Sequence, residues 1–433
     1  MTIIQRLKHQ IAAWPYPLVS VMAAIAAFGA YTSMYAFRKS FSAGVYGEQE
    51  YLHIDYKVWL VIAQLIGYTL SKFYGIRFIA EVSPKKRTFY VLLLIGIAWA
   101  ALLGFAIVPA PYNIVFLFIN GFPLGMIWGL IFGYLEGRKS TEFMAAVMSI
   151  SLIFASGFVK TVGRTLITSF GVSEYFMPFL TGALFVIPLV IFVFFLELMP
   201  PPTLEDKKLR AERVPMSATD RWQFLIRFIP GIMLVVIIYV MLTVMRDVRD
   251  NFEVEIWAEL GVKGNNIYTH VDSIISIIVL VMMSLLILVK NNRLAFKYIH
   301  LFIITGFVLL GISTWMFDHQ LIHPVTWMTF AGIGLYMGYV PFNAIFFERM
   351  IATFNCRSNV GFVMYIADSV GYLGTISIMM FKEFGSGHIG WSAFFKNGIG
   401  YVALIGGVCS VLSLIYFMHS AKSSKKIYKY EVI

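Results

Sequence analysis

The sequence predicts an all-α membrane protein of twelve transmembrane helices, arranged as two pseudo-symmetric halves of six. Three observations predict this class. Of the 433 residues, 59% are hydrophobic and only 13% are charged, whereas soluble domains carry about 25% charged residues. Twelve apolar stretches are about 20 residues long, which is the length of a helix that crosses a bilayer. A polar segment in the middle of the chain separates the first six stretches from the last six.

Each predicted span is placed on one of these apolar runs. The first run is too long and too aromatic for a cleaved signal peptide, so we expect it to remain as the first span. The predicted ranges are 17–38, 57–76, 88–108, 113–135, 143–169, 176–197, 228–249, 267–289, 299–317, 325–347, 359–382 and 393–418.

Lysine and arginine are concentrated in alternate connections between the spans, for example Arg77 with 85–87, and Arg138 with Lys139. The opposite connections carry acids such as Glu253 and Glu255. Short loops rich in lysine and arginine remain on the cytoplasmic side of a membrane. Both termini are therefore expected in the cytoplasm, and the net charge of +11 indicates membrane topology, with no nucleic acid as partner. The compact loops favour a bacterial inner membrane.

The longest internal polar stretch contains three consecutive prolines, 200–202, followed by residues of mixed charge. It predicts an N-terminal six-helix half at 1–197, a cytoplasmic linker at 198–225 and a C-terminal six-helix half at 226–433. Two parallel six-helix repeats are the plan of the major facilitator fold.

Seven cations lie in or at the ends of these apolar runs: Arg38, Lys39, Lys72, Lys160, Arg164, Arg246 and Arg249. A cation at the bilayer centre costs at least about 2.5–3.5 kcal/mol, so it normally faces a cavity or a partner. Several cations that converge on one cavity would bind an anion. The sequence therefore predicts a carrier of anionic solutes.

The first two spans place hydroxyl groups near two of these cations. Tyr31 and Tyr35 precede Arg38, and Tyr68 precedes Lys72. Hydroxyls beside an arginine suit recognition of an oxyanion, because the planar guanidinium binds phosphate or carboxylate with two hydrogen bonds. The alternative for Arg38 is an aromatic belt with a snorkelling arginine. The alternative for Lys72 is the cytoplasmic end of its helix.

Lys160 and Arg164 are four residues apart, so they share one face of the fifth span. Two like charges on one face repel each other unless something negative lies beside them. A bound anionic solute is one explanation, and snorkelling to the outer headgroups is the other.

The second half offers Arg246, with Asp247 beside it, and a single acid well inside a span, Asp368. Arg246 is the deepest cation of its span and is a candidate to bind substrate, although an i,i+4 pair with Asp250 is the alternative. Asp368 can pair with a basic residue or titrate as a proton-coupling site. We assign Asp247 and Asp368 to charge pairing or coupling.

At these residues the chain resembles the organophosphate:phosphate antiporter family, which includes the glycerol-3-phosphate and hexose-6-phosphate carriers. Residues Ala30–Phe41 (AYTSMYAFRKSF) resemble the family's first-span motif, and Gly67–Phe73 (GYTLSKF) its second-span motif. Residues 120–128 and 359–374 are similar to its fourth and eleventh spans. The fifth span lacks a match to the family's substrate-site histidine and carries Lys160 and Arg164 instead.

The resemblance implies that Arg38 and Arg246, one from each half, clamp the phosphate of the substrate. It also implies exchange of a phosphorylated metabolite against inorganic phosphate by alternating access. The expected partners are a small anionic solute, inorganic phosphate or protons, and the lipid bilayer, and we expect a monomer. The alternatives are a proton-coupled carboxylate carrier, another major facilitator transporter such as a drug exporter, and a transporter-like solute sensor.

Motifs of soluble enzymes are missing from the sequence. It contains no phosphate-binding glycine-rich loop followed by lysine and serine or threonine, no zinc-ligand spacing and no HExxH. We therefore expect no enzyme activity, no cofactor and no metal.

Overall fold

The computed structural model describes residues 3–203, 206, 218–354, 360–385 and 389–430. Nearly all of these residues are helical, and their only strands are β1 (Glu50–Tyr51) and β2 (Ile54–Asp55), which form one antiparallel hairpin. The prediction of an all-α fold is confirmed.

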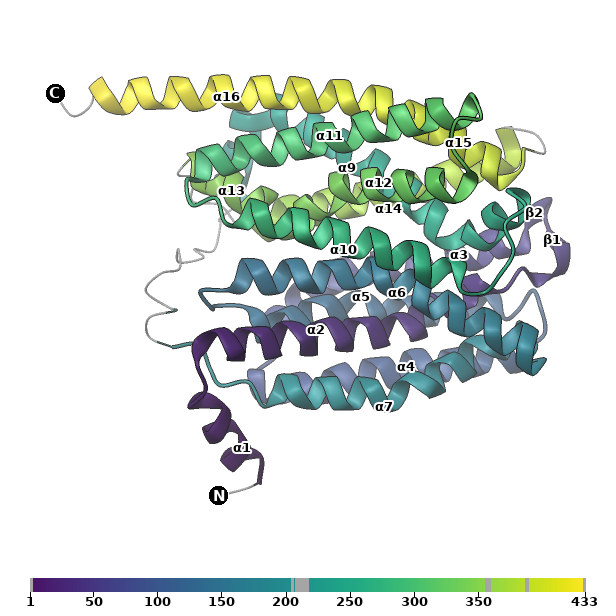
Figure 1. Cartoon of the computed structure of the whole chain (residues 1–433). Helices are drawn as coiled ribbons and strands as arrows, with labels where there is room; N and C mark the ends of the chain where they lie inside the picture. The colour runs from purple at the N-terminus through teal and green to yellow at the C-terminus, as the bar shows by residue number, and fades with distance from the viewer. Residues whose placement is uncertain (1–2, 204–205, 207–217, 355–359, 386–388, 431–433) are drawn as a thin grey trace. The chain divides into compact units, whose positions relative to one another are not determined.

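Long helices follow one another along the chain with short connections (Figure 1). Three short 3₁₀ turns, η1 (Ser40–Ala43), η2 (Tyr46–Glu48) and η3 (Pro84–Lys86), lie between them, and a π-helical turn, η4 (Val402–Gly406), joins α15 to α16. The helices are α1 (Ile3–Ala12), α2 (Tyr16–Arg38), α3 (Tyr56–Glu81), α4 (Arg87–Ile107), α5 (Ile114–Leu135), α6 (Thr141–Phe170), α7 (Met177–Glu197), α9 (Ala218–Glu259), α10 (Ile267–Ile287), α11 (Asn292–Asp318), α12 (Pro324–Ala344), α13 (Phe346–Phe354), α14 (Val360–Gly385), α15 (Trp391–Tyr401) and α16 (Gly407–Tyr430).

In the part of the chain that the structure describes, nine helices are long and apolar enough to cross a membrane. The number rises to ten if α12 and α13, which meet at a bend of 53°, form one broken span. The protein is therefore an integral membrane protein with multiple spans. Helix α3 is 26 residues long but is not among the nine. Its mean hydropathy is lowered by Gln64, Thr69, Ser71 and Lys72. The total of twelve spans and the cytoplasmic location of both termini stay predictions.

Helix α9 is longer than the predicted span at 228–249. The backbone leaves helical geometry at Phe252, with φ −115° and ψ 20°, and the helix then continues to Glu259. Glu253 and Glu255, which we predicted in an exposed connection, lie in this continuation, and Glu253 is fully buried. That prediction was wrong, because partners far away in the sequence neutralise these acids, as described below.

The chain forms two compact units, which are described separately. Unit 1 comprises Met1–Arg210, Asp250–Ile277 and Met379–Ile389, and unit 2 comprises Ala211–Arg249, Ile278–Ile378 and Gly390–Ile433. The end of α9 and the start of α10 thus belong with the N-terminal unit. Residues 204–205 and 207–217 of the predicted linker lie outside the described residues. The boundaries of two six-helix halves stay a prediction.

Glycines bring helices α3 and α5 of unit 1 into backbone contact. A Cβ atom on Gly67 would lie 2.2 Å from the carbonyl oxygen of Phe118, and one on Gly121 would lie 2.3 Å from that of Gln64. No side chain fits at either position, so glycine sets the close approach of the two helices. On the other side of the unit, α2 packs along α6 and α7 (Figure 1).

Glycines also bring α11 and α12 of unit 2 into backbone contact. Cβ atoms on Gly306 and Gly334 would each lie within 2.8 Å of the carbonyl oxygen of the other glycine. Helix α16 packs against α11 (Figure 1), and rings of Phe296, Phe354 and Phe417 meet in this part of the core. Backbone contact between small residues is typical of helix packing in membranes, where no hydrophobic force draws helices together.

Candidate functional site

One face of α2 presents Tyr31, Tyr35 and Arg38, which are spaced i, i+4 and i+7. All three side chains are buried, with exposed fractions of 5% or less. The rings of Tyr31 and Tyr35 lie 5.6 Å apart. The guanidinium carbon of Arg38 lies 4.0 Å from the ring centroid of Tyr68 on α3 and 5.6 Å from that of Tyr35.

The second cation beside Tyr68 is Lys72, one turn later on α3. Its Nζ lies 5.1 Å from the Tyr68 ring centroid, so one ring lies close to two cations. A cation over a desolvated aromatic ring gains about 2 kcal/mol. We call Tyr31, Tyr35, Arg38, Tyr68 and Lys72 the Tyr68 cluster. The sequence predicted all five residues as substrate-binding candidates, and the fold of unit 1 brings them together.

Two buried amides hold the end of α2 in place. Gln64 donates from Nε2 to the carbonyl oxygen of Arg38 at 2.7 Å and to Oδ1 of Asn120 at 2.8 Å. Asn120 donates from Nδ2 to the carbonyl oxygens of Phe37 and Ala98, each at 2.9 Å. The last carbonyls of a helix lack partners within the helix, so these bonds fix the backbone that carries Arg38. The sequence analysis did not assign this role, although an amide inside an apolar span is a visible signal.

Three lysines of unit 1 meet the last turns of α9. Lys160 Nζ lies 2.7 Å from Glu253 Oε2, and both side chains are 0% exposed. Lys57 Nζ lies 2.5 Å from Glu255 Oε1 and donates to the carbonyl oxygen of Ser42 at 3.0 Å.

Lys39 donates from Nζ to Asn251 Oδ1 at 2.7 Å. We call these six residues, Lys39, Lys57, Lys160, Asn251, Glu253 and Glu255, the lysine–α9 network. Lys160 was predicted to bind substrate, and its buried partner Glu253 is a finding of the structure. Arg164, one turn later on α6, is half-buried and donates from Nη1 to the carbonyl oxygen of Ala43 at 3.4 Å.

The start of α3 is set by Asp55, which lies outside the predicted span. Its carboxylate accepts a hydrogen bond from the backbone N–H of Lys57 at 2.7 Å and so caps the helix. The Asp55 N–H donates to Glu383 Oε2 at 3.1 Å. Burial raises the pKa of the Asp55 carboxyl, against the lowering effect of the hydrogen bond and charge of Lys57. These contacts position Lys57 for its pair with Glu255.

Unit 2 surrounds its candidate arginine with acids and tyrosines. Arg246 Nη2 lies 2.6 Å from Asp247 Oδ1, and its guanidinium carbon lies 4.2 Å from the ring centroid of Tyr339. Asp247 Oδ2 accepts a hydrogen bond from the hydroxyl of Thr375 at 3.1 Å. Arg246 therefore pairs with its neighbour Asp247, and the alternative i,i+4 pair with Asp250 stays a prediction.

The predicted coupling residue Asp368 is 6% exposed. The hydroxyl of Tyr239 donates to its Oδ1, and the hydroxyls of Tyr239 and Tyr339 lie 3.3 Å apart. We call Tyr239, Arg246, Asp247, Tyr339, Asp368 and Thr375 the Asp368 cluster. A tyrosine partner for Asp368 was not part of the sequence prediction, which offered a pair with a basic residue or a proton-coupling role.

Histidines in the described residues do not assemble a metal centre. No group of three His, Cys, Asp or Glu side chains within that part of the chain could hold a metal ion. His300 is buried, and its ring nitrogens lie 2.9 Å from the carbonyl oxygen of Phe296 and 3.2 Å from the Ser413 hydroxyl. This histidine has a structural role in the core of unit 2.

Residues 40–420 match a family described as a family of unknown function (DUF5690). No curated protein matches the chain. The fold is similar to a crystal structure of the D-xylose-proton symporter, with a TM-score of 0.60, 15% identity, and coverage of 93% of this chain and 97% of the other.

A second similar structure is the major facilitator superfamily proton:xylose symporter XylE bound to 6-bromo-6-deoxy-D-glucose. Its TM-score is 0.56 at 15% identity, and the match covers 93% of this chain and 94% of XylE. At this level of identity the likeness concerns the fold alone. The chain therefore shares the fold of these two structures, while twelve spans in two six-helix halves stay a prediction.

Proposed function

The chain belongs to DUF5690, a family of unknown function, and from this premise we propose that it is a secondary active transporter of an anionic organic solute. The observation that carries the proposal is the Tyr68 cluster, where two cations lie at one buried ring. The two similar structures are sugar–proton symporters, which favours transport of a small solute over catalysis. We place the protein in the bacterial inner membrane as a monomer.

The chemistry of the Tyr68 cluster favours an oxyanion as ligand. Arg38 offers a planar fork that binds phosphate or carboxylate with two parallel hydrogen bonds, and Lys72 adds a point charge. Hydroxyls of Tyr31, Tyr35 and Tyr68 supply further donors. In a low-dielectric site such charge-assisted bonds are roughly twice as strong as neutral ones. A neutral sugar would gain little from two neighbouring cations.

The finer proposal is a phosphorylated metabolite that is exchanged for inorganic phosphate by alternating access. Its support is the resemblance of Ala30–Phe41 and Gly67–Phe73 to the organophosphate:phosphate antiporters, together with a second buried arginine, Arg246. We propose that Arg38 and Arg246 both bind the anion and that Arg164 adds positive potential, whereas the pair with Glu253 offsets the charge of Lys160.

Proton-coupled symport is a second candidate function, and the Asp368 cluster favours it. A buried carboxylate that accepts a tyrosine hydroxyl can take up a proton and keep a hydrogen-bond partner. Buried acids inside membrane spans commonly relay protons. The symport named for the two similar structures adds to this candidate. The substrate would remain an anion, with Asp368 as the coupling site and Asp247 as the residue that pairs with Arg246.

Uptake into proteoliposomes tests both candidates. Vesicles loaded with phosphate, or with an imposed proton gradient, are offered labelled glycerol 3-phosphate, glucose 6-phosphate, a dicarboxylate and xylose. We expect uptake of an anion that Arg38→Ala abolishes and that Arg77→Gln leaves intact, because Arg77 lies in an exposed pair with Glu81. Uptake of xylose alone, or equal uptake by Arg38→Ala and the parent, would contradict the proposal.

A further inference from the structure

A short helix, α1, lies before the first long helix of unit 1 and is amphipathic. Leu7 and Ile11 are spaced i, i+4 and fall on one side of the helix, and Trp14 follows two residues after its end. Arg6 and Lys8 flank this apolar side, and His9 lies opposite it. A helix with an apolar face, a basic face and an aromatic residue at its end is typical of helices that lie in the membrane interface.

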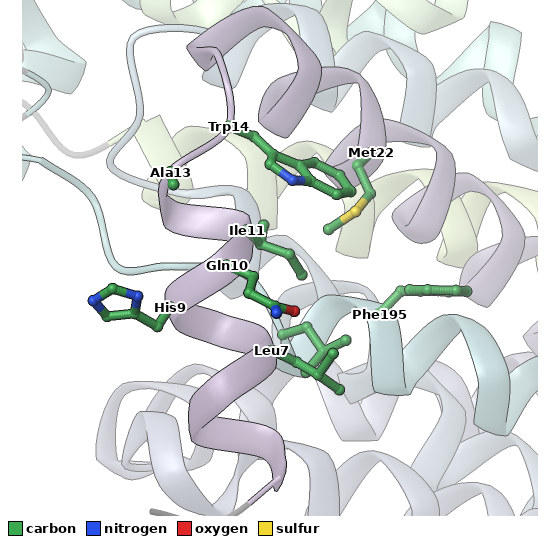
Figure 2. Close-up of a pocket in the computed structure, with 9 residues that line it drawn as sticks. Leu7, His9, Gln10, Ile11, Ala13, Trp14, Met22 and Phe195 are labelled. Carbon is green, nitrogen blue, oxygen red and sulfur yellow. The ribbon is translucent and has the colours of Figure 1, made fainter.

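The apolar side of α1 forms one wall of a groove, and the ends of α2 and α7 form the other. Figure 2 shows Leu7, Ile11 and Trp14 on the side of α1 that faces Met22 of α2 and Phe195 of α7, with His9 pointing away. The groove has a volume of about 670 Å³, within the roughly 300–1,000 Å³ of sites that hold small organic molecules.

The groove is open to the surroundings of the helices. Trp14 is 41% exposed and Phe195 39% exposed, while Leu198 at its base is buried. Its neighbours along α2, Leu18 and Val21, are also exposed apolar residues of a helix apolar enough to span a membrane. In a bilayer such a surface contacts hydrocarbon, so the groove continues the lipid-facing side of unit 1.

The position of α1 is fixed by an ion pair. Lys8 Nζ lies 2.7 Å from Glu197 Oε1 at the end of α7, and Glu197 Oε2 accepts the hydroxyl of Thr88 at 2.7 Å. The helix therefore stays beside α7 and keeps the groove in place. Helix α1 contains no acidic residue, and Arg6 is exposed. Since Glu197 offsets the charge of Lys8, Arg6 leaves the described part of α1, which forms one wall of the groove, with a net positive charge.

We propose that this groove is a binding site for an anionic phospholipid. One acyl chain lies along Leu7, Trp14, Met22 and Phe195, and Arg6, next to Leu7 on α1, attracts the phosphate of the headgroup. Charge complementarity selects an anionic over a zwitterionic lipid, since each lysine or arginine near an anionic surface contributes about five-fold in affinity. The site lies apart from the Tyr68 cluster and does not depend on the proposed transport activity.

Native mass spectrometry of the full chain in detergent tests this site, with dioleoyl phosphatidylglycerol and dioleoyl phosphatidylcholine added in equal amounts. We expect the parent protein to retain phosphatidylglycerol at least about five-fold more strongly than phosphatidylcholine. Arg6→Gln should remove that preference, and Trp14→Ala should weaken retention of both lipids. Thermal unfolding of each variant, measured without added lipid, checks that the fold is intact.

Two matched variants act as controls elsewhere on unit 1. Phe89→Ala removes an aromatic ring that is 61% exposed on α4, and Lys85→Gln removes an exposed cation near it. Both should retain the parent preference. Equal retention of the two lipids by the parent would overturn the proposal. So would a loss in the control variants as large as in Arg6→Gln and Trp14→Ala.

Discussion

Unit 1 and unit 2 each bury an arginine against a tyrosine ring, but they surround it with opposite chemistry. In unit 1, Arg38 shares the Tyr68 ring with a second cation, Lys72. In unit 2, Arg246 lies over the Tyr339 ring with a carboxylate, Asp247, at 2.6 Å. The first arrangement places two cations at one ring, and the second places a carboxylate beside its arginine. We infer that unit 1 supplies most of the attraction for an anion and that unit 2 supplies groups that exchange protons.

Unit 1 also shows that a buried cation does not by itself indicate a binding site. Lys160 is as deeply buried as any residue of the Tyr68 cluster, yet Glu253 pairs with it at 2.7 Å. A buried ion pair costs desolvation that its own attraction largely offsets. Lys160 is therefore expected to matter more for folding and conformational change than for direct contact with the solute.

The largest effect is expected at Arg38. Arg38→Ala should weaken binding of the anionic solute by at least about 30-fold, because truncating one partner of a buried, hydrogen-bonded charge pair costs about 2–5 kcal/mol. Arg38→Lys should recover part of this loss, since it restores the charge but not the planar fork. Equilibrium binding of the labelled solute to each purified protein measures both.

The matched variant for this prediction is Arg246→Ala, which tests the contrast between the units. Because Asp247 lies beside Arg246, whereas Lys72 adds a second cation at the ring that Arg38 contacts, we expect a smaller loss of affinity than for Arg38→Ala. A loss at Arg246 that equals or exceeds the loss at Arg38 would reverse the assignment of the two units.

A loss of stability should follow when the Lys160–Glu253 pair is broken. Glu253→Gln leaves a buried lysine without its carboxylate and is expected to lower the free energy of unfolding by about 3–5 kcal/mol. The double variant Lys160→Met with Glu253→Leu should recover most of this loss, because it removes both charges. Thermal unfolding in detergent compares the three proteins. If Glu253→Gln is as stable as the parent, the pair has no structural role.

A change in coupling is expected at Asp368. Asp368→Asn removes the titratable proton but keeps an acceptor for Tyr239. We expect about a ten-fold smaller response of uptake to an imposed proton gradient, of the order that general acid–base groups contribute at the lower end. Asp318→Asn, in a surface pair with Lys396, is the control. If uptake by Asp368→Asn responds to the proton gradient as strongly as uptake by the parent, Asp368 is not a coupling site. Of the two proposed functions, phosphate exchange would then remain.

The smallest effect is expected at Asp206, in a polar cluster of unit 1 apart from both sites. Its carboxylate accepts hydrogen bonds from the N–H groups of Lys139 and Thr203, at 2.8 and 2.9 Å, and from the Tyr16 hydroxyl at 3.0 Å. Burial alone would raise the pKa of Asp206, but these hydrogen bonds outweigh it, so the pKa lies below its ordinary value of 3.8.

Because the pKa of Asp206 is lower in the folded than in the unfolded protein, its ionised carboxylate stabilises the fold. This stabilisation is fully present at pH values above the ordinary pKa. It is lost as the pH falls through the pKa of the folded state. Asp206→Asn should therefore unfold more easily than the parent at pH 7, by about 1–2 kcal/mol. The difference in the free energy of unfolding between Asp206→Asn and the parent should become smaller below about pH 4. Uptake by Asp206→Asn should differ little from uptake by the parent. A large loss of uptake would show that this polar cluster takes part in transport.

Much of the fold could be predicted from the sequence, because membrane spans follow from apolar runs alone. Most predicted ranges lie within a few residues of the observed helices, such as 17–38 and Tyr16–Arg38. The members of the Tyr68 cluster could also be predicted from the sequence, since Tyr31, Tyr35 and Arg38 share one helical face and Tyr68 and Lys72 share another. The major facilitator fold was predicted because a polar segment divides the apolar runs into two sets of six.

The lysine–α9 network could not be predicted in this way. Charges at Glu253 and Glu255 normally end a span, so the sequence placed them in water. The structure extends α9 to Glu259 because Lys57 and Lys160, 198 and 93 residues away along the chain, neutralise these acids. Periodicity describes local structure and carries no information on which distant charges meet.

The central claim is that the Tyr68 cluster recognises an anionic group, and competition in the uptake assay tests it most directly. Labelled glycerol 3-phosphate would be offered to parent and Arg38→Ala proteoliposomes, with unlabelled glucose 6-phosphate or xylose as competitor. The account predicts that the parent takes up the label, that glucose 6-phosphate but not xylose competes, and that Arg38→Ala takes up none. Uptake that xylose blocks, or that survives in Arg38→Ala, would contradict it.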